Sequence, residues 1–463
     1  MKHLKPDATI VHISSEVYPF SKTGGLAEVL GALPTEQAQM GLRVAVISPW
    51  YASLNGQPTH VGQVRIPGMF EDVRLGHIRE QGVDCFFIGY PGFDRDRLYG
   101  YPDDVERFVH FCKAVPYVLD RLNIAPDVVH THDWQAGILP ALIRFTPVPP
   151  RFSRTQFIHS VHNLQYQGRW NPWDILSWTG LPASLMNPEG MEFYGDVNLM
   201  KAGLVYSDRV VAVSSTYVQE ITTSDYGEGL DGVLRKLKHE GRLVGILNGI
   251  DSERWNPSTD PLADFSTPLE KKRARDRLVH RLGISGGPPI LAVISRFAHQ
   301  KGIDLVADAL PELLKGWTVV VLGDGDPLLE TVFSLLSQYV PNFFFFAGYN
   351  EPLAHEVYAG ADSVLMPSRF EPCGLTQLIA MRYGTLPIVR DTGGLHDTVS
   401  PDIGFLFGPF TADALVEASR QALEVWKDRE AWLGRVTQAM AYNSSWSASA
   451  GRYLDLYNIS AFR

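Results

Sequence analysis

Thr23-Gly24-Gly25-Leu26 recurs near the other end of the chain as Thr392-Gly393-Gly394-Leu395. Each copy follows a short apolar run typical of a strand and precedes a run typical of a helix. Paired glycines at a helix start let the backbone approach a ligand, and the free N–H groups there favour an anion. One such pair is more often only a tight turn. Its repetition, beside the polar residues Lys22 and Asp391, predicts two similar domains that offer helix starts to a shared anionic ligand.

Short apolar segments alternate with amphipathic ones along the whole chain. Strand candidates in the first half lie at 9–13, 43–48, 85–89, 127–131, 156–161 and 209–213. The alternation restarts after 244–248, with strand candidates at 290–295, 318–322, 342–347, 363–366 and 387–389. This pattern predicts an α/β protein with two doubly wound parallel sheets. Ligands of such folds bind beyond the carboxyl ends of the strands, so we expect the loops there to carry the chemistry.

The composition is that of a soluble globular protein. The chain has 463 residues, 45% of them hydrophobic and 20% charged, which is enough for about two to three domains. A formal net charge of −10 argues against nucleic acids and anionic membranes as partners. An anionic substrate must therefore be held by a few local cations, and candidates lie at 295–301.

Cysteine content and hydropathy indicate the compartment. Cys85, Cys112 and Cys373 are odd in number and form no CxxC pair, which excludes a disulfide framework and a cysteine-rich zinc module. The first residues lack the apolar core of a signal peptide, and no run of about 18 apolar residues occurs. We therefore expect a cytoplasmic protein with no membrane span.

Arg296 and Lys301 are the first candidates for chemistry. They follow the first strand of the second domain, five residues apart at a loop-to-helix junction. A guanidinium fork and an ammonium point charge together suit a diphosphate. The alternative is a solvated surface pair, which the position at a strand end disfavours.

Residues 369–376 form a second candidate loop after the strand that ends near Met366. Pro372 and Gly374 indicate that a helix begins there, with its free N–H groups facing the same site. Glu371 is placed to accept hydrogen bonds from sugar hydroxyls. It can also be explained as a helix N-terminal carboxylate that the dipole stabilises.

Two polar pairs end strands of the first domain, His132-Asp133 and His162-Asn163. Two histidines and an aspartate suggest zinc, but HExxH spacing is absent and no cysteine supports such a site.

Other motifs remain ambiguous. Residues 324–326 (Asp-Gly-Asp) are explained more simply as a strand-to-helix turn than as a metal loop. The GxG at 323–325 has Leu328 where a dinucleotide fingerprint needs its third glycine, so a nicotinamide oxidoreductase is disfavoured. Trp170, Trp173 and Trp178 can stack on sugars or pack in a core, and the sequence does not decide between these roles.

Eight motifs, in chain order, resemble those of bacterial glycogen synthases and plant starch synthases, glycosyltransferase family 5. They are KTGGLAEV at 22–29, HDWQAG at 132–137, VHN at 161–163, ILNGID at 246–251, SR at 295–296, QKG at 300–302, PSRFEPCGL at 367–375 and TGGL at 392–395. The resemblance runs from about residue 11 to 400 and is specific. It implies a GT-B fold, with two Rossmann-like doubly wound domains that face a deep interdomain cleft.

The resemblance also implies a domain plan and an activity. Residues 1–245 would form an N-terminal acceptor-side domain, the starch synthase catalytic domain, and 246–443 a nucleotide-sugar donor domain. Residues 444–463 would form a C-terminal helix that returns to the first domain. The family transfers glucose from ADP-glucose to the non-reducing end of an α-1,4-glucan such as glycogen. Transfer proceeds with retention and without a metal or other cofactor.

Site residues carry over by position. The catalytic set would be Glu371, Arg296, Lys301 and His162. The donor would be bound by Lys22, Gly24, Gly25, Asn248, Tyr349, Cys373, Gly374, Leu375, Thr392, Gly393 and Gly394. The sugar or acceptor side would include Glu28, Asp133 and Asn163.

The family assigns a role to several of these groups. Arg296 and Lys301 would neutralise the departing diphosphate, and Glu371 would hold glucose hydroxyls. His162 would lie beside the glucose, with its backbone carbonyl near the developing positive charge. Backbone N–H groups at the two glycine pairs would contact the phosphates, with Lys22 lining the phosphate and acceptor side. Tyr349 would stack on adenine.

Three positions depart from the pattern. Glu28 stands where the family usually has Asp, which puts its contact with the sugar or acceptor in doubt. Gln135 stands where the bacterial enzymes often have His, and no role is assigned to it. Ile379 stands where related retaining transferases place a second glutamate, which favours the starch-synthase branch.

Alternatives of other classes are weaker. A hydrolase needs two carboxylates flanking the sugar, and no such pair is evident. What remains is a front-face route, in which the leaving phosphate helps deprotonate the incoming hydroxyl.

Three other kinds of protein compete with the family assignment. A UDP-sugar transferase of the same fold is an open alternative. A non-catalytic glucan-binding protein would be indicated by loss of Arg296, Lys301 or Glu371, all of which are present. A glycogen phosphorylase would need a pyridoxal-phosphate lysine and, going by that family, a far longer chain.

Overall fold

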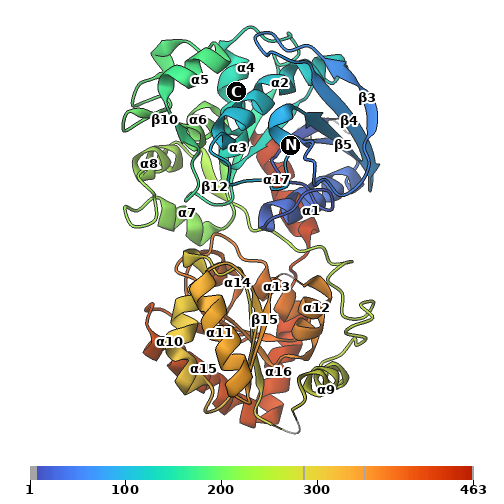
Figure 1. The fold of residues 1–463 in the computed structure, drawn as a ribbon, viewed down its shortest axis with the longest axis vertical. Helices are drawn as coiled ribbons and strands as arrows, with labels where there is room; N and C mark the ends of the chain where they lie inside the picture. Colours follow the sequence, from blue (N-terminus) through green and yellow to red (C-terminus); the bar gives the residue numbers. More distant parts are fainter. Residues whose placement is uncertain (1–7, 285–286, 349, 461–463) are drawn as a thin grey trace. The chain divides into compact units, whose positions relative to one another are not determined.

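The computed structural model describes residues 8–284, 287–348 and 350–460, without the side chains of 458–460 (Figure 1). The chain forms two compact units. Unit 1 comprises Met1–Leu247 and Trp446–Arg463, and unit 2 comprises Asn248–Ser445.

Unit 1 is built on a nine-stranded sheet of order β12-β11-β7-β6-β1-β2-β5-β4-β3. Its strands are β1 (Thr9–Ile13), β2 (Arg43–Pro49), β3 (Thr59–Val64), β4 (Val73–Glu80), β5 (Val83–Gly89), β6 (Val128–His132), β7 (Gln156–Val161), β11 (Arg209–Ala212) and β12 (Leu243–Gly245). The strands from β12 to β5 pair in parallel, whereas β4 pairs antiparallel with both β5 and β3. The predicted parallel sheet is therefore confirmed, with an antiparallel extension at one edge that the apolar alternation did not predict.

Helices surround this sheet. They are α1 (Gly25–Gln39), α2 (Asp104–Arg121), α3 (Asp133–Gly137), α4 (Leu139–Phe145), α5 (Pro172–Thr179), α6 (Leu199–Tyr206), α7 (Ser215–Ile221), α8 (Asp231–His239) and α17 (Trp446–Ser460), with 3-10 turns at Pro91–Phe93 and Ala183–Leu185. A small sheet of order β8 (Arg169–Trp170), β10 (Asp196–Asn198) and β9 (Glu192–Phe193) completes the unit.

The last helix belongs to unit 1, although unit 2 separates it from the rest of that unit in the sequence. In Figure 1 the red α17 lies beside the blue α1. Trp446, Tyr453 and Tyr457 share a buried cluster with Val29 and Leu33 of α1. Burial of such large apolar groups supplies the main stabilisation of the contact.

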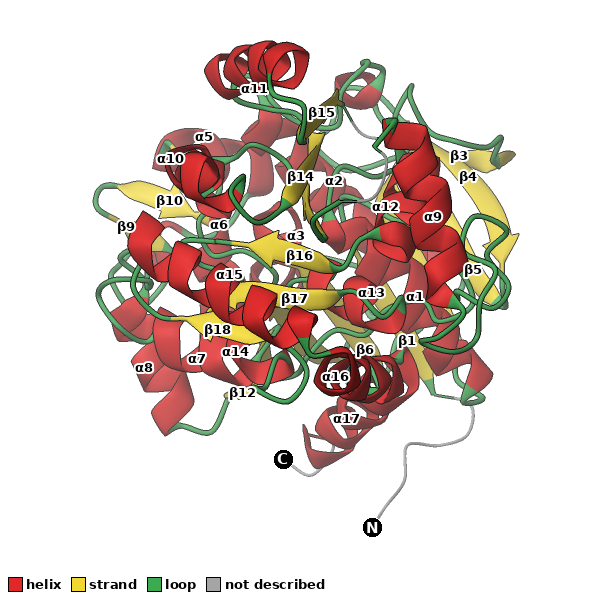
Figure 2. Ribbon diagram, turned by 90° about the horizontal axis from the view of Figure 1, so that it is seen from below, coloured by secondary structure: helices red, strands yellow, loops and turns green. Residues whose placement is uncertain are grey.

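Unit 2 is a six-stranded parallel sheet of order β15-β14-β13-β16-β17-β18 (Figure 2). Its strands are β13 (Ile290–Ile294), β14 (Thr318–Gly323), β15 (Phe343–Ala347), β16 (Ser363–Met366), β17 (Leu386–Arg390) and β18 (Phe405–Phe407). Its helices are α9 (Lys271–Leu282), α10 (Ile303–Leu313), α11 (Pro327–Tyr339), α12 (Glu351–Gly360), α13 (Thr376–Arg382), α14 (Gly393–Thr398), α15 (Ala412–Lys427) and α16 (Arg429–Ala441), with a 3-10 turn η3 (His299–Lys301).

Central strands of unit 2 are apolar throughout, as in sheets covered on both faces. All six residues of β14 (TVVVLG) are buried. The first strand, β13, lies between β14 and β16, so the loops after β13 and β16 emerge side by side. None of the described helices is both long and apolar enough to cross a membrane.

Candidate active site

The predicted site residues fall into two groups, one in each unit. In unit 1 the first glycine pair precedes α1, which begins at Gly25. The carboxylate of Glu16, buried just beyond the end of β1, accepts hydrogen bonds from this loop. Its donors are the Thr23 N–H at 2.5 Å, the Thr23 hydroxyl at 2.7 Å and the Gly24 N–H at 3.3 Å. The Tyr99 hydroxyl donates from 2.8 Å. Glu16 therefore fixes the shape of the loop from inside the protein.

Sequence reasoning did not single out Glu16. A usable signal existed, because Ser14-Ser15-Glu16 places polar residues directly at the carboxyl end of the first strand. The same criterion selected Asp133 and His162 on the neighbouring strands.

Lys22 and Glu28 form an ion pair. Lys22 Nζ lies 2.5 Å from Glu28 Oε1, and both side chains are partly buried. Glu28 lies in the first turn of α1, one turn beyond the loop that carries the lysine. The carboxylate at this position thus orients the cation expected to face the phosphate.

Asp133 connects the ends of two adjacent strands. β6 and β7 pair in parallel, with His132 opposite Ser160, so Asp133 follows β6 beside the end of β7. Its Oδ1 accepts from the N–H groups of His162, at 2.7 Å, and Asn163, at 3.3 Å. Its φ of +54° lies in the left-handed region, which non-glycine residues seldom adopt outside special sites. Burial raises the pKa of Asp133 to about 7, against the opposing effect of the two backbone hydrogen bonds.

His162 is partly buried at the end of β7. Its Nε2 lies 3.0 Å from His132 Nδ1. Burial lowers the pKa of His162 to about 3, so the imidazole is neutral at neutral pH.

In unit 2, Lys301 and Glu371 are directly paired. Lys301 Nζ lies 2.6 Å from Glu371 Oε2, and the two side chains are 21% and 5% exposed. The Ser368 hydroxyl donates to the same oxygen from 2.9 Å. Glu371 Oε1 has no hydrogen-bond partner among the described residues. The carboxylate therefore holds Lys301 through one oxygen, and the other oxygen is not used by a neighbouring side chain among the described residues.

Adjacent strands bring this pair together. Lys301 lies in η3 after β13, and Glu371 lies in the loop after the neighbouring β16. Gly302 allows the close approach, because its φ is +65° and a Cβ there would lie 2.2 Å from the Pro367 carbonyl oxygen. The Arg369 N–H donates to the Gln300 carbonyl at 2.8 Å, which joins the two loops.

Arg296 lies on the same loop as Lys301 and is exposed. Within the part of the chain that the structure describes, its guanidinium has no hydrogen-bond or ion-pair partner. It differs in this from Lys301 and remains available to an anion.

The second glycine pair packs against the Glu371 loop. The Gly394 N–H donates to the Glu371 carbonyl oxygen at 2.9 Å. A Cβ at Gly394 would lie 2.1 Å from the Cys373 carbonyl oxygen. Thr392 and Gly393 lie at the junction of β17 and α14, beside this contact.

The remaining donor-side predictions surround the same loop. Cys373 is buried, which raises the pKa of its thiol to about 12, and the Asn248 N–H donates to the sulfur. Asn248 Oδ1 is buried with no partner among the described residues. Gly374 and Leu375 directly precede α13. Tyr349 lies outside the described residues.

The structure decides one of the ambiguous motifs and gives the surroundings of another. Asp326 caps α11, accepting from the N–H groups of Leu328 and Leu329, so this loop is a strand-to-helix turn. Of the three tryptophans, Trp170 and Trp178 lie with ring centroids 6.1 Å apart. Trp173 is 76% exposed.

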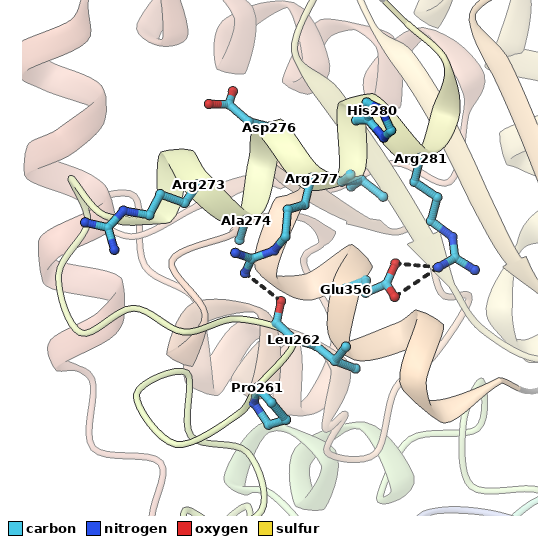
Figure 3. A pocket seen from close by; sticks show the side chains of 10 residues that line it. Pro261, Leu262, Arg273, Ala274, Asp276, Arg277, His280, Arg281 and Glu356 are labelled. Atoms are coloured by element: carbon cyan, nitrogen blue, oxygen red, sulfur yellow. Dashed lines mark hydrogen bonds and ion pairs between the residues drawn. The ribbon is translucent and has the colours of Figure 1, made fainter.

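A separate cavity of about 510 Å³ lies on unit 2 (Figure 3). Arginines of α9 line it together with Leu262 and Glu356. Arg281 pairs with Glu356, and Arg277 donates to the Leu262 carbonyl oxygen. None of the predicted site residues lines this cavity.

Comparison with known proteins identifies the family. Residues 9–236 match the family model of the starch synthase catalytic domain, and residues 274–435 match that of glycosyl transferases group 1. The glycogen synthase of Deinococcus radiodurans is 53% identical over 451 residues, covering 97% of this chain and 99% of that protein. The glycogen synthase of Thermus thermophilus is 41% identical over 457 residues, covering 97% and 98%.

Solved structures of similar fold support the same family assignment. The catalytic domain of starch synthase IV from Arabidopsis thaliana, bound to ADP and acarbose, matches with a TM-score of 0.92 at 32% identity, covering 99% of this chain and 100% of that one. A sucrose-phosphate synthase from Thermosynechococcus elongatus shares the fold, with a TM-score of 0.64 at 18% identity. Two α/β units, each built on a largely parallel sheet, together with these matches define a glycosyltransferase of the GT-B type. Within that class, the chain belongs to the glycogen synthase and starch synthase family.

Proposed function

We propose that the chain is a glycogen synthase that transfers glucose from ADP-glucose to the non-reducing end of an α-1,4-glucan, with retention and without a metal. The observation that carries the proposal is the partly buried Lys301–Glu371 pair, on the same loop system as Arg296, which has no partner among the described residues. Residues 1–245 would serve the acceptor and 246–443 the donor, with 444–463 as the returning helix.

Arg296 and Lys301 would stabilise the departing diphosphate. The charge on this group grows as the sugar bond breaks, so fixed cations beside it bind the transition state more strongly than the substrate. Lys301 is held in place by Glu371, so little reorganisation is needed when the reaction occurs. The glycine pairs would add backbone donors at helix starts.

Glu371 would bind the glucose through Oε1, the oxygen that neither Lys301 nor Ser368 uses. A carboxylate only accepts hydrogen bonds, so it selects sugar hydroxyls as donors. His162, neutral at working pH, would lie beside the sugar without adding a positive charge. Lys22, Glu28, Asp133 and Asn163 would shape the acceptor side.

A transfer assay tests the proposal. The purified chain is incubated with glycogen and radiolabelled ADP-glucose or UDP-glucose, and label in the polymer is counted. We expect faster incorporation from ADP-glucose, unchanged by EDTA, and α-linked product by proton NMR. Equal or faster incorporation from UDP-glucose would overturn the donor assignment. Absence of transfer from both would overturn the proposed activity itself.

A further inference from the structure

A continuous chain of hydrogen bonds runs through the core of unit 1 from His162 to the C-terminal helix. His162 Nε2 lies 3.0 Å from His132 Nδ1, and His132 Nε2 lies 3.0 Å from His12 Nδ1. His12 Nε2 lies 2.8 Å from Gln37 Oε1. Beyond Gln37, its Nε2 lies 3.1 Å from the Tyr457 hydroxyl.

The series of hydrogen bonds continues from Tyr457 through one more histidine and ends at a serine. The Tyr457 hydroxyl lies 2.9 Å from His130 Nδ1, and His130 Nε2 lies 2.7 Å from the Ser160 hydroxyl. All members except His162 are buried. They come from β1, α1, β6, β7 and α17, so the chain ties the returning helix to the end of β7. We call this set the histidine relay: His162, His132, His12, Gln37, Tyr457, His130 and Ser160.

If every imidazole in the relay is neutral, the hydrogen bonds from Gln37 to His162 must all have the same donor-to-acceptor direction. A neutral imidazole has one donor and one acceptor nitrogen, and an amide oxygen only accepts. Gln37 Oε1 therefore requires the proton of His12 on Nε2, which leaves His12 Nδ1 to accept from His132 Nε2. His132 Nδ1 must then accept from His162 Nε2. The result is that His162 carries its proton on Nε2 and presents a bare Nδ1.

The imidazoles are neutral, as this logic requires. Burial lowers the pKa of His12 to about 4, and holds those of His130 and His132 well below the ordinary range. Reversing the Gln37 amide would reverse every bond along the relay and move the His162 proton to Nδ1. In the structure the amide oxygen faces His12 and the amide nitrogen faces the Tyr457 hydroxyl.

A metal site is the competing explanation. Among the described residues, His12, His130 and His132 have ring nitrogens within 4.8 Å of one another. Their rings stack, however, with centroids 4.2 to 5.3 Å apart and interplanar angles of 27° to 38°. Each of these nitrogens also has a hydrogen-bond partner already.

We propose that Gln37 and Tyr457 are positioning residues that set the tautomer of His162, so that its Nδ1 accepts a hydrogen bond from a hydroxyl of the bound sugar. The catalytic consequence rests on the proposed function, whereas the tautomer itself does not. Through Tyr457, the C-terminal helix thus takes part in the chemistry without contacting a substrate.

The test uses full-length protein with 15N-labelled histidine. Long-range 1H–15N correlation spectra show which ring nitrogen is protonated, and His162→Gln identifies the His162 signals. We expect Nε2–H in the unmodified chain, and Nδ1–H or a mixture in Gln37→Leu and Tyr457→Phe. In glucose transfer, kcat/KM for the donor should fall about tenfold, the effect of losing one hydrogen bond.

Tyr453→Phe is the matched control, since it removes a hydroxyl from the same helix one turn earlier. It should leave the tautomer and kcat/KM unchanged. Nδ1–H in the unmodified chain would overturn the proposal. The proposal would also be overturned if Gln37→Leu and Tyr457→Phe both folded and kept the tautomer of the unmodified chain. An equal change of tautomer and activity in Tyr453→Phe would overturn it as well. If the chain transferred no glucose, the spectra would still decide the tautomer.

Discussion

At the scale of single residues, Lys301 and Glu371 act as a pair. We predict that Lys301→Ala lowers kcat about 10²- to 10³-fold, by analogy with the loss of an oxyanion donor. Donor KM should change less, because the cation acts mainly on charge that develops in the transition state. Steady-state kinetics with varied donor concentration measures both values.

The structure adds a complication to this experiment. Removing Lys301 leaves the buried Glu371 carboxylate without its cation, which is itself destabilising. Lys301→Arg, which keeps the charge, should retain more activity at similar stability. Lys315→Ala removes an exposed lysine that pairs with Glu312 on the surface of unit 2, and it should change neither kcat nor stability appreciably. A normal kcat in folded Lys301→Ala would remove Lys301 from the site.

Asp133 gives a prediction about pH. Its folded pKa, about 7, lies above the ordinary 3.8, so the folded protein binds this proton more tightly than the unfolded chain. The contribution of Asp133 to stability is therefore largest below about pH 4 and declines as pH rises to 7, by about 1.4 kcal/mol per unit. Asp133→Asn keeps an acceptor for the His162 N–H and removes the charge. We expect it to be more stable than the unmodified chain at pH 8, but not at pH 5, in denaturant titrations.

Asp127→Asn is the control for this effect. Asp127 is exposed and accepts from the Thr9 N–H, so it makes a similar backbone contact without burial. Its replacement should give no comparable dependence on pH. A parallel pH profile for Asp133→Asn and the unmodified chain would contradict the buried, high-pKa carboxyl.

At the scale of elements, the junction of β17 and α14 determines the position of the Glu371 loop. We predict that Gly394→Ala lowers the melting temperature and abolishes most activity, because its Cβ would overlap the Cys373 carbonyl oxygen, 2.1 Å away. The backbone cannot yield as a side-chain tip does, and the Gly394 N–H bond to Glu371 would be strained. Calorimetry and the transfer assay measure the two effects.

Gly434→Ala serves as the comparison. Gly434 lies inside α16, and a Cβ there meets nothing within 4 Å. This substitution should raise stability by about 0.5–1 kcal/mol through helix propensity and leave kcat unchanged. Gly394→Ala with full activity would show that the loop tolerates displacement.

Elements also show what the sequence could predict. The strands β13, β14 and β16 were predictable because they are continuous apolar runs. The strand β3 could not be predicted in this way, because five of its six residues (THVGQV) are at least partly exposed and its sequence lacks an apolar run. The Lys301–Glu371 pair depends on β13 lying beside β16, which single-residue patterns do not encode. Doubly wound topology, which commonly places the first and fourth strands together, was a usable signal for it.

At the scale of the whole molecule, buried histidines distinguish the two units. Unit 1 holds a set of histidines whose pKa burial lowers: His12 and His110 to about 4, His159 and His162 to about 3, and His130 and His132 well below 6.5. In unit 2, His280, His299 and His396 are exposed, and His355 pairs with Asp260.

We predict that acid unfolds unit 1 before unit 2. Where burial lowers the pKa of a histidine, the unfolded chain binds its proton at a higher pH than the folded chain does. The free energy of unfolding therefore falls as the pH drops below about 6.5. The loss is about 1.4 kcal/mol per pH unit for each histidine until its folded pKa is reached. Asp133 and Glu106, whose pKa values burial raises, act in the opposite direction, but they are two groups against six. In unit 2, burial lowers the pKa of Lys271 from 10.5 to about 7, so that group titrates above this range.

Pulsed hydrogen exchange measures the order of unfolding. The chain is held at a series of pH values from 7 to 4, then labelled briefly under one common condition. Peptides from β1, β6 and β7 should lose protection at a higher pH than peptides from β13, β14 and β16. Because these unit 1 strands carry the histidines of the relay or end beside them, their opening should coincide with loss of glucose transfer. Simultaneous loss in both units, or earlier loss in unit 2, would show that the buried neutral histidines do not govern acid stability.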